Sequence, residues 1–227
     1  MIPLKDDRIR NSFPVFTLLL IAVNTLVFLY EASLGPRAQQ VLVFQYGMVP
    51  THMEAALTHS TVPIYLAIEP IFTSMFLHGG WLHLIGNMWF LWVFGITVED
   101  RMGHAWYLIF YLLCGLAAGV THTVVNWNSH LPAIGASGAI AGVMGAYLVL
   151  FPRAKILTLV PLLFFFFFWR LPAIVMIGFW FAIQFFNGVA SLGVRDAGDV
   201  AWWAHVGGFA LGAVIALGMR VEEPTYA

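Results

Sequence analysis

The sequence has few charged side chains. Lys, Arg, Asp and Glu make up 9% of its 227 residues, whereas a soluble domain carries about 25%. Hydrophobic residues make up 61% of the chain, and the mean hydropathy is +0.86. This composition excludes an ordinary soluble domain. Only 10 Lys and Arg are present, so no basic surface for nucleic acid is expected. The sequence predicts an integral membrane protein whose surroundings are a lipid bilayer.

Cysteine is also scarce. The only one, Cys114, stands inside an apolar run, which excludes a disulfide framework and a cysteine-based zinc site. His78 and His83 are close in sequence, but no HExxH motif or convergent carboxylate accompanies them. The sequence therefore predicts neither a metal site nor a cofactor.

Long apolar segments are abundant instead. A spanning helix needs roughly 20 apolar residues, and six segments approach that length: Pro14–Tyr30, His83–Val98, Trp106–Val125, Ala136–Phe151, Leu171–Asn187 and Trp203–Met219. The apolar run Ile156–Phe168 has 13 residues and favours an interfacial or re-entrant segment. We expect an all-α polytopic bundle of six transmembrane helices. It would form one domain over residues 1–227, with a short N-terminal segment (1–13) and a short tail (221–227).

Positive charge indicates how these spans are oriented. In a six-span arrangement most cations near span ends fall on one side: Lys5, Arg8, Arg10, Arg101, Arg153, Lys155 and Arg220. Arg37 and Arg195 fall on the other side. Because cytoplasmic loops carry an excess of Lys and Arg, we expect both termini in the cytoplasm and Glu31–Thr73 as a long extracytoplasmic first loop. This arrangement suits a multi-pass protein of the plasma or inner membrane.

Two polar residues of the second span share one helix face. His83 and Asn87 are four residues apart, which places their side chains one turn from each other. Polar groups inside a span usually face the bundle interior and are candidates for function. The pair could join two helices by hydrogen bonds, or it could supply hydrogen-bond donors to a reaction.

A serine and a histidine stand in two glycine-rich spans. Ser137 lies in GASGAIAGVMG, and His205 precedes Gly208 and Gly212 in AHVGGFALG. Small residues repeated every four positions let membrane helices approach closely. These stripes could be packing seams only. If the two helices pack against each other, however, hydroxyl and imidazole can come within the roughly 2.6–3.2 Å that proton transfer requires.

The motifs together resemble those of the rhomboid intramembrane serine proteases. The resemblance rests on GASG around Ser137, AHxxG at His205, HGGWLHLIGN from His78 to Asn87, and the ExR element formed by Glu99 and Arg101. It implies a catalytic dyad of Ser137 as nucleophile and His205 as general base. It also implies an oxyanion hole made by His83, Asn87 and the Ser137 N–H. Structural support would come from His78, Gly135, Glu99, Arg101, Gly208 and Gly212.

Two positions depart from the pattern of that family. Many relatives carry Tyr or Phe one turn after the serine, where the ring supports the histidine, but this chain has Ala141. Something else must hold the imidazole of His205. The first loop also lacks the family's Trp-Arg pair before Ser74. The resemblance therefore does not say how this loop is anchored.

The resemblance implies an intramembrane serine endopeptidase that cleaves single-pass membrane proteins within their transmembrane segments. A rhomboid-like protein that binds membrane clients without cutting them is the alternative, although such a protein should lack Ser137 or His205. A transporter would need charged groups inside its spans, and an aspartyl protease would need two intramembrane aspartates. The predicted spans contain neither. Gln184 in the fifth span could join helices or face a gate. The aromatic residues around it could form that gate or face lipid.

Overall fold

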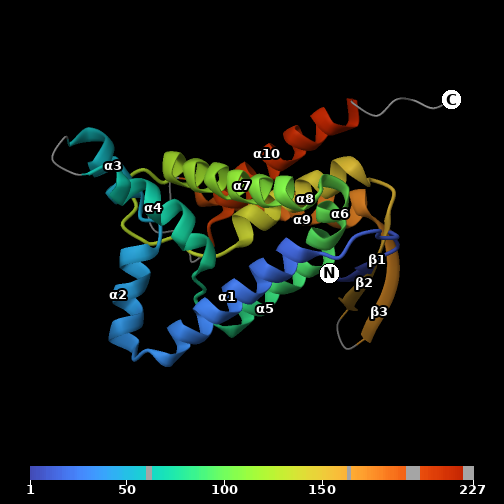
Figure 1. Ribbon diagram of the computed structural model, residues 1–227, viewed down its shortest axis with the longest axis horizontal. Coiled ribbons are helices and arrows are strands. Elements are labelled where there is room, and N and C mark those ends of the chain that lie inside the picture. The colour runs from blue at the N-terminus through green and yellow to red at the C-terminus, as the bar shows by residue number, and fades with distance from the viewer. Residues whose placement is uncertain (60–62, 163–164, 193–199, 222–227) are drawn as a thin grey trace.

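The computed structural model describes residues 1–59, 63–162, 165–192 and 200–221, and its architecture is a helical bundle with a small sheet at one end (Figure 1). The helices are α1 (Val15–Ser33), α2 (Pro36–Tyr46), α3 (Pro50–Thr58), α4 (Tyr65–Thr73), α5 (Trp81–Phe90), α6 (Ile96–Met102), α7 (His104–Val125), α8 (Ser137–Leu150), α9 (Ala173–Ser191) and α10 (Trp202–Val221). A 3-10 turn, η1 (Ser74–Phe76), precedes α5, and a π-helical segment, η2 (Leu91–Gly95), joins α5 to α6.

Six apolar helical segments match the six predicted spans. Within the described residues, five are long and apolar enough to cross a membrane: Val15–Ser33, Trp81–Met102, His104–Val125, Ala173–Ser191 and Trp202–Arg220. The fourth predicted span is the exception, because α8 has only 14 residues. The prediction of a helical polytopic membrane protein is confirmed, although five helices, rather than six, have full spanning length in the described part of the chain.

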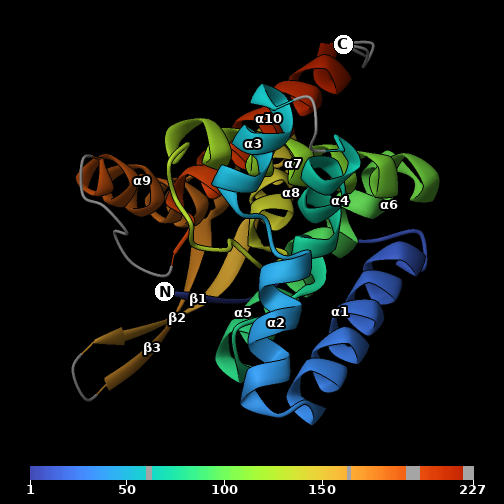
Figure 2. The same ribbon diagram turned by 90° about the vertical axis from the view of Figure 1, so that its left-hand side faces the viewer.

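The short helix α8 lies at the centre of the bundle, between α7 and α10 (Figures 1 and 2). Every residue from Gly138 to Tyr147 is buried. A helix that is apolar on all sides is covered by protein or by lipid, and here the helices α7 and α10 cover it. Its first residue, Ser137, is half-buried.

The predicted first loop, Glu31–Thr73, contains the three helices α2, α3 and α4. They gather at the end of the molecule farthest from the sheet (Figure 1). In place of the missing Trp-Arg pair, the loop is held by other contacts. The Thr73 hydroxyl donates a 2.7 Å hydrogen bond to the Tyr46 carbonyl, and the Ile71 side chain packs against Gly119 of α7.

The run Ile156–Phe168 differs from the prediction, because it belongs to a sheet. Strands β1 (Ile2–Asp6), β2 (Lys155–Leu162) and β3 (Phe165–Pro172) form an antiparallel sheet in the order β1-β2-β3. β-Branched and aromatic residues favour this conformation. Pro172 ends β3, and α9 starts at Ala173 rather than at the predicted Leu171. The sheet occupies the end of the bundle that carries the N-terminus (Figure 2).

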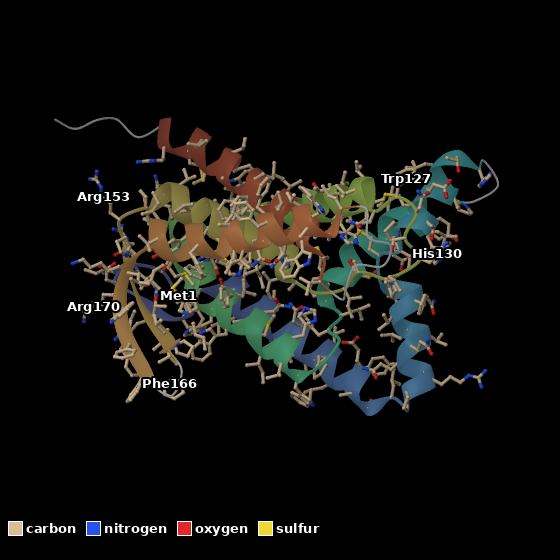
Figure 3. All side chains as sticks on the ribbon, turned by 180° about the vertical axis from the view of Figure 1, so that it is seen from behind. Met1, Trp127, His130, Arg153, Phe166 and Arg170 are labelled. Atoms are coloured by element: carbon tan, nitrogen blue, oxygen red, sulfur yellow. The ribbon has the colours of Figure 1, made fainter. Side chains whose placement is uncertain are left out.

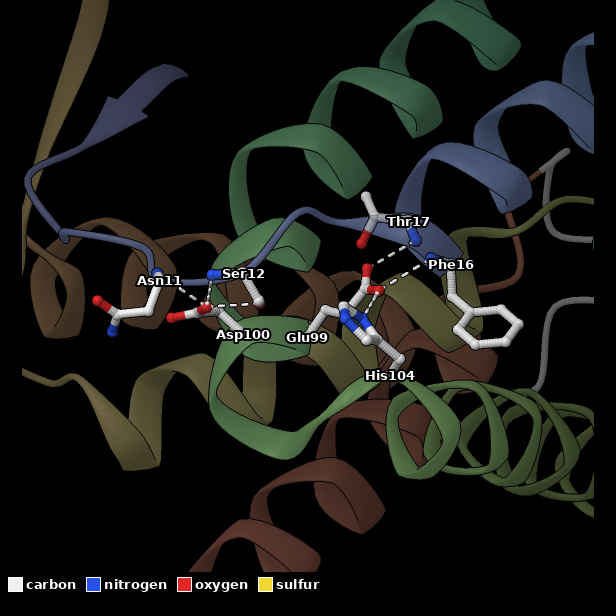
Figure 4. A network of polar contacts seen from close by, with 7 residues as sticks. All are labelled: Asn11, Ser12, Phe16, Thr17, Glu99, Asp100 and His104. Atoms are coloured by element: carbon white, nitrogen blue, oxygen red, sulfur yellow. Dashed lines mark hydrogen bonds and ion pairs between the residues drawn. The ribbon is translucent and has the colours of Figure 1, made fainter.

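A carboxylate from the second span caps the first helix. Glu99 accepts hydrogen bonds from the backbone N–H groups of Phe16 and Thr17, both at 2.8 Å, and contacts His104 Nδ1 at 2.7 Å (Figure 4). The first N–H groups of a helix have no partner within the helix and carry the positive end of its dipole. The buried Glu99 therefore joins the start of α1 to the end of the second span.

The neighbouring Asp100 extends this junction. Its Oδ1 accepts hydrogen bonds from the Asn11 N–H (3.0 Å), the Ser12 N–H (2.7 Å) and the Ser12 hydroxyl (2.6 Å) (Figure 4). Arg101, which the resemblance pairs with Glu99, lies half-buried in α6 beside them. This part of the motif is thus built into the contact between α6 and the segment that leads into α1.

Candidate active site

Ser137 is the first residue of α8 and follows a tight turn. Gly135 has φ +120°, a conformation that glycine adopts without the steric cost of a side chain. Its N–H donates a 2.8 Å hydrogen bond to the Ser74 carbonyl. This contact fixes the irregular segment before α8 against the η1 turn and sets the direction in which Ser137 enters the helix.

His205 of α10 contacts Ser137 directly. The distance from His205 Nε2 to Ser137 Oγ is 2.7 Å. Glycine makes the approach of the two helices possible, since a Cβ at Gly208 would overlap the Gly138 carbonyl of α8. The stripes of small residues found in the sequence are therefore a seam, and that seam brings hydroxyl and imidazole together.

The other imidazole nitrogen has a partner that the sequence did not reveal. His205 Nδ1 lies 2.8 Å from Gln184 Oε1 on α9. The rings of Trp180 and Trp202 flank the imidazole, with centroid distances of 5.8 Å and 6.3 Å. Ala141, which stands where relatives place a ring, is fully buried. The imidazole is thus held from α9 and α10 rather than from α8.

His83 and Asn87 meet the chain at the turn before Ser137. A Cβ at Gly135 would lie 2.7 Å from His83 Nε2 and 3.6 Å from Asn87 Nδ2. Asn87 Nδ2 is buried without a hydrogen-bond partner among the described residues. Because buried polar groups are nearly always paired, an unpaired donor calls for an explanation. Its amide nitrogen lies beside the turn that precedes Ser137.

His78 has a different environment from His83. Its side chain is fully buried, its N–H donates to Glu31 Oε2 at 3.1 Å, and its Nδ1 lies 3.3 Å from the Phe76 carbonyl. Its ring meets the His83 ring edge-on at 5.1 Å. Burial, and secondarily the charge of His83, lower the pKa of His78 to about 4. His78 is a neutral packing residue between α1 and α5.

A cavity of about 1710 Å³ opens onto these groups. Its lining includes His83, Asn87, Ser137, Gln184 and His205, together with the segment from Val125 to Ile134. Trp127 and His130 of that segment lie at the end of the molecule opposite Arg153 and Arg170 (Figure 3). The cavity is therefore at the end occupied by α2–α4, away from the sheet.

Known proteins resemble this chain in sequence. A profile of the Rhomboid domain matches residues 67–221. The chain is 34% identical over 141 residues to the rhomboid protease GluP of Bacillus subtilis, covering 61% of this chain and 25% of that protein. It is 31% identical over 154 residues to the mitochondrial rhomboid protein 1 of Saccharomyces cerevisiae, covering 63% and 40%.

A third relative is aligned over more of the chain. The mitochondrial presenilin-associated rhomboid-like protein A of Danio rerio is 31% identical over 180 residues, covering 77% of this chain and 43% of the relative. The matched segments thus span between a quarter and less than half of these three relatives. The profile match over residues 67–221 includes His83, Asn87, Ser137, Gln184 and His205.

Proposed function

This chain belongs to the rhomboid family, and from that premise we propose that it is a serine endopeptidase that cleaves peptide bonds within the membrane. The observation that carries the proposal is the 2.7 Å contact between Ser137 Oγ and His205 Nε2 at the wall of the cavity. A serine hydroxyl is a weak nucleophile unless a neighbouring base takes its proton. The contact supports His205 in the role of that base.

The reaction would proceed by acyl transfer. His205 Nε2 removes the Ser137 proton as Oγ attacks the carbonyl carbon of the substrate, and His205 then gives that proton to the leaving amine. Water enters the cavity and is activated by the same nitrogen, which releases the acyl group from Ser137. No Asp or Glu contacts His205 in the described part of the chain, so the pair acts as a dyad.

Three donors would stabilise the negative charge on the carbonyl oxygen. The Ser137 N–H opens α8 and has no partner within the helix. The unpaired Asn87 Nδ2 and the His83 ring lie beside it across Gly135. Donors placed in advance at a developing charge stabilise the transition state without reorganisation. The orphaned amide of Asn87 is explained if the substrate oxygen is its partner.

The length of α8 suits a reaction below the membrane surface. Fourteen residues make a helix of about 21 Å, whereas the hydrocarbon core is about 30 Å thick. The far end of α8 reaches the sheet, so its start at Ser137 would lie within the bilayer. Irregular backbone at such depth is tolerated where it is buried or lines a wet cavity, and the segment before α8 lines the cavity.

The substrates would be single-pass membrane proteins. A transmembrane helix hides its amides in its own hydrogen bonds, so a local unwinding has to precede attack by Ser137. Helix-weakening residues such as Gly or Pro near the cleaved bond would assist that step. Helix α9, with the exposed Phe179 and Phe186, would be the side from which substrates enter.

The protein is an integral multi-pass membrane protein, and we propose that its N-terminus lies in the cytoplasm of the cell. Arg153 and Arg170 project at the end of the molecule that carries the sheet (Figure 3), and an excess of Lys and Arg is typical of the cytoplasmic side. The cavity would then open to the outside of a plasma or inner membrane. Labelling of single surface cysteines in intact cells tests this orientation.

Reconstitution with a single-pass substrate tests the activity. The wild type should cleave it, and Ser137→Ala and His205→Ala should not, while Ser33→Ala at the exposed end of α1 should match the wild type. A fluorophosphonate should label the wild type and not Ser137→Ala. Cleavage by Ser137→Ala would refute the proposal. Binding of the substrate without cleavage by the wild type would favour the non-proteolytic alternative.

A further inference from the structure

The hairpin formed by β2 and β3 lies across the end of the bundle. It runs across the axes of α7 and α8 rather than along them (Figure 1), and the two strands extend beyond the outline of the helices (Figure 2). In a membrane crossed by these helices, such a hairpin lies parallel to the bilayer plane. Its two faces therefore point in opposite directions, one toward the bilayer and one away from it.

One face of the hairpin points toward the helices and carries a row of aromatic rings. Paired residues of neighbouring strands share a face. Ile156 and Thr158 are fully buried, so their face is the one directed at the bundle. Thr158 pairs with Trp169, and Val160 pairs with Phe167. Farther out on this face the rings of Trp169, Phe167 and Phe165 follow one another at 6.1 Å and 6.4 Å, with 52%, 39% and 69% of each residue exposed.

The opposite face carries the cations. Lys155 pairs with Pro172, and Leu157 pairs with Arg170, which places both cations on the face away from the helices. Arg170 projects from the outer edge of the molecule (Figure 3). The exposed Phe166 and Phe168 share this face farther out. Charge is thus confined to the face away from the bundle, at the base of the hairpin.

The depth of the hairpin is limited by its backbone. β3 is an edge strand whose partner in the described residues is β2. Its outer N–H and C=O groups need hydrogen-bond partners that the hydrocarbon core cannot supply. The exposed rings, in turn, disfavour a position in bulk water. The bilayer interface meets both needs, because aromatic side chains concentrate there and water and headgroups are within reach.

A hydrogen bond also joins the sheet to the second span. Trp89 and Trp92 of the second span are exposed by 42% and 45%, as expected for side chains that face lipid. Trp89 Nε1 donates a hydrogen bond to the Pro3 carbonyl in β1 at 2.5 Å. The sheet is therefore joined to the lipid-facing side of the second span.

We propose that the β2–β3 hairpin is an anchor in the bilayer interface. The rings of Phe165, Phe167 and Trp169 contact the lipids of the nearer leaflet, and Lys155 and Arg170 face the headgroups and water. The occupant of this exposed aromatic face is lipid rather than a second copy of the chain or another protein.

Fluorescent labels on the two faces test this anchor. In a Cys114→Ala background, Phe167→Cys and Arg170→Cys would each carry an environment-sensitive dye, with the protein in phosphatidylcholine–phosphatidylglycerol vesicles. The label at 167 should emit at a shorter wavelength than the label at 170. It should also be quenched several-fold more than the label at 170 by lipids that are brominated on their acyl chains. The label at 170 should be quenched more by iodide. The two positions belong to one strand and serve as controls for each other.

Equal quenching of both labels by iodide would overturn the proposal, because the hairpin would then stand in water. Protection of the label at 167 from both quenchers would also overturn it, since protein would cover that face. Protection that is lost when the lipid-to-protein ratio is raised would identify a second copy as the occupant. Each outcome is independent of proteolytic activity.

A separate observation concerns the amide of Gln184, and the inference from it rests on the proposed function. Gln184 Nε2 donates to the Trp180 carbonyl at 3.2 Å, and Gln184 Oε1 lies 2.8 Å from His205 Nδ1. If the side-chain amide were flipped, Gln184 Oε1 would face the Trp180 carbonyl oxygen, and two acceptors would then meet without a proton between them. Because Oε1 can only accept, Nδ1 of His205 must carry the proton. Nε2 is then free to accept the proton of Ser137.

We infer that Gln184 is the positioning residue of the dyad. It selects the tautomer of His205 and holds the plane of the imidazole ring. In relatives with Tyr or Phe in place of Ala141, an aromatic ring on α8 would help to hold that plane. An unsuitable tautomer strongly reduces turnover in serine proteases. Gln184 makes its contact through Oε1, so the acceptor atom, rather than the bulk of the side chain, is what matters.

Substitutions that keep or remove the acceptor test this role. Gln184→Met, similar in size but without a carbonyl, should lower kcat by about tenfold to a hundredfold with little change in KM, and should slow fluorophosphonate labelling of Ser137 by a similar factor. Gln184→Glu, which retains an acceptor, should keep most of the kcat. Wild-type kcat in Gln184→Met would overturn the inference. An inactive wild type would instead contradict the proposed function.

Discussion

Gly212 of α10 faces Gly142 of α8 so closely that a Cβ on Gly212 would overlap the Gly142 carbonyl oxygen. This backbone-to-backbone contact lies five residues after Ser137 on α8 and seven residues after His205 on α10. The separation of the helices, and with it the 2.7 Å contact of the dyad, depends on the absence of side chains along this seam.

We expect Gly212→Val to abolish cleavage and to lower thermal stability. The added side chain has to push α10 away from α8, and overpacking of this kind costs about 1–3 kcal/mol. Gly218→Ala is the matched control, because a Cβ there meets nothing within 4 Å. Thermal unfolding in detergent and cleavage in vesicles measure the two effects. Unchanged activity of Gly212→Val would show that the seam does not set the dyad distance.

The turn at Gly135 should be equally intolerant of a side chain. Gly135→Ala forces a φ of +120° on a residue that disfavours it and places a Cβ 2.7 Å from His83 Nε2. We expect kcat to fall at least tenfold, since the oxyanion donors and the start of α8 would shift together. Gly178→Ala, where a Cβ meets nothing within 4 Å, should behave like the wild type. Full activity of Gly135→Ala would contradict the geometry given for this turn.

Replacement of Asn87 should affect rate and stability differently. Asn87→Ala removes an oxyanion donor, and we expect a loss of about 10²–10³ in kcat. Because Asn87 Nδ2 has no partner among the described residues, its removal should cost little thermal stability. A large drop in melting temperature with unchanged kcat would indicate that Asn87 joins two helices by hydrogen bonds. The sequence alone had left that alternative open.

Loss of the Glu99 carboxylate should destabilise the fold without a direct effect on the dyad. Glu99→Gln keeps the shape but removes the charge that caps α1, and hydrogen bonds to charged groups contribute about 1.5–3 kcal/mol. We expect a lower melting temperature and an unchanged rate of Ser137 labelling at low temperature. Glu69→Gln, at an exposed position of α4, is the control. Equal stability of the two variants would refute the capping role.

Acidification should destabilise the protein through His78. Burial, followed by the charge of His83, lowers the pKa of His78 from 6.5 in the unfolded chain to about 4 in the fold. Between these values the unfolded chain binds a proton that the folded chain does not, so stability falls as the pH drops. Between pH 7 and pH 5 this group should remove about 2 kcal/mol. Melting temperatures of the wild type should fall more steeply over this range than those of His78→Gln.

The sequence was sufficient to predict the spanning helices and a close approach between α8 and α10, because both depend on local patterns, whereas the pairing of Ser137 with His205 was implied by the resemblance to the rhomboid proteases. Long apolar runs indicate spans, and glycines at four-residue intervals indicate a close approach. The sheet was missed because β1 and β2 are separated by about 150 residues. In addition, Phe165–Phe168 is apolar on both faces and shows no strand-like alternation. Gln184 was found as a polar residue, but its partner on another helix follows only from the tertiary packing of α9 against α10.

Helix α9 begins where the hairpin ends and carries Gln184 twelve positions along its length. A bilayer that is thicker or thinner than the apolar length of a helix is accommodated partly by helix tilt. If the hairpin fixes one end of α9 at the interface, a change of tilt moves Gln184 relative to His205. Hydrophobic mismatch thus becomes a variable of the catalytic site, and the turnover of this protein is expected to depend on the acyl-chain length of the lipids around it.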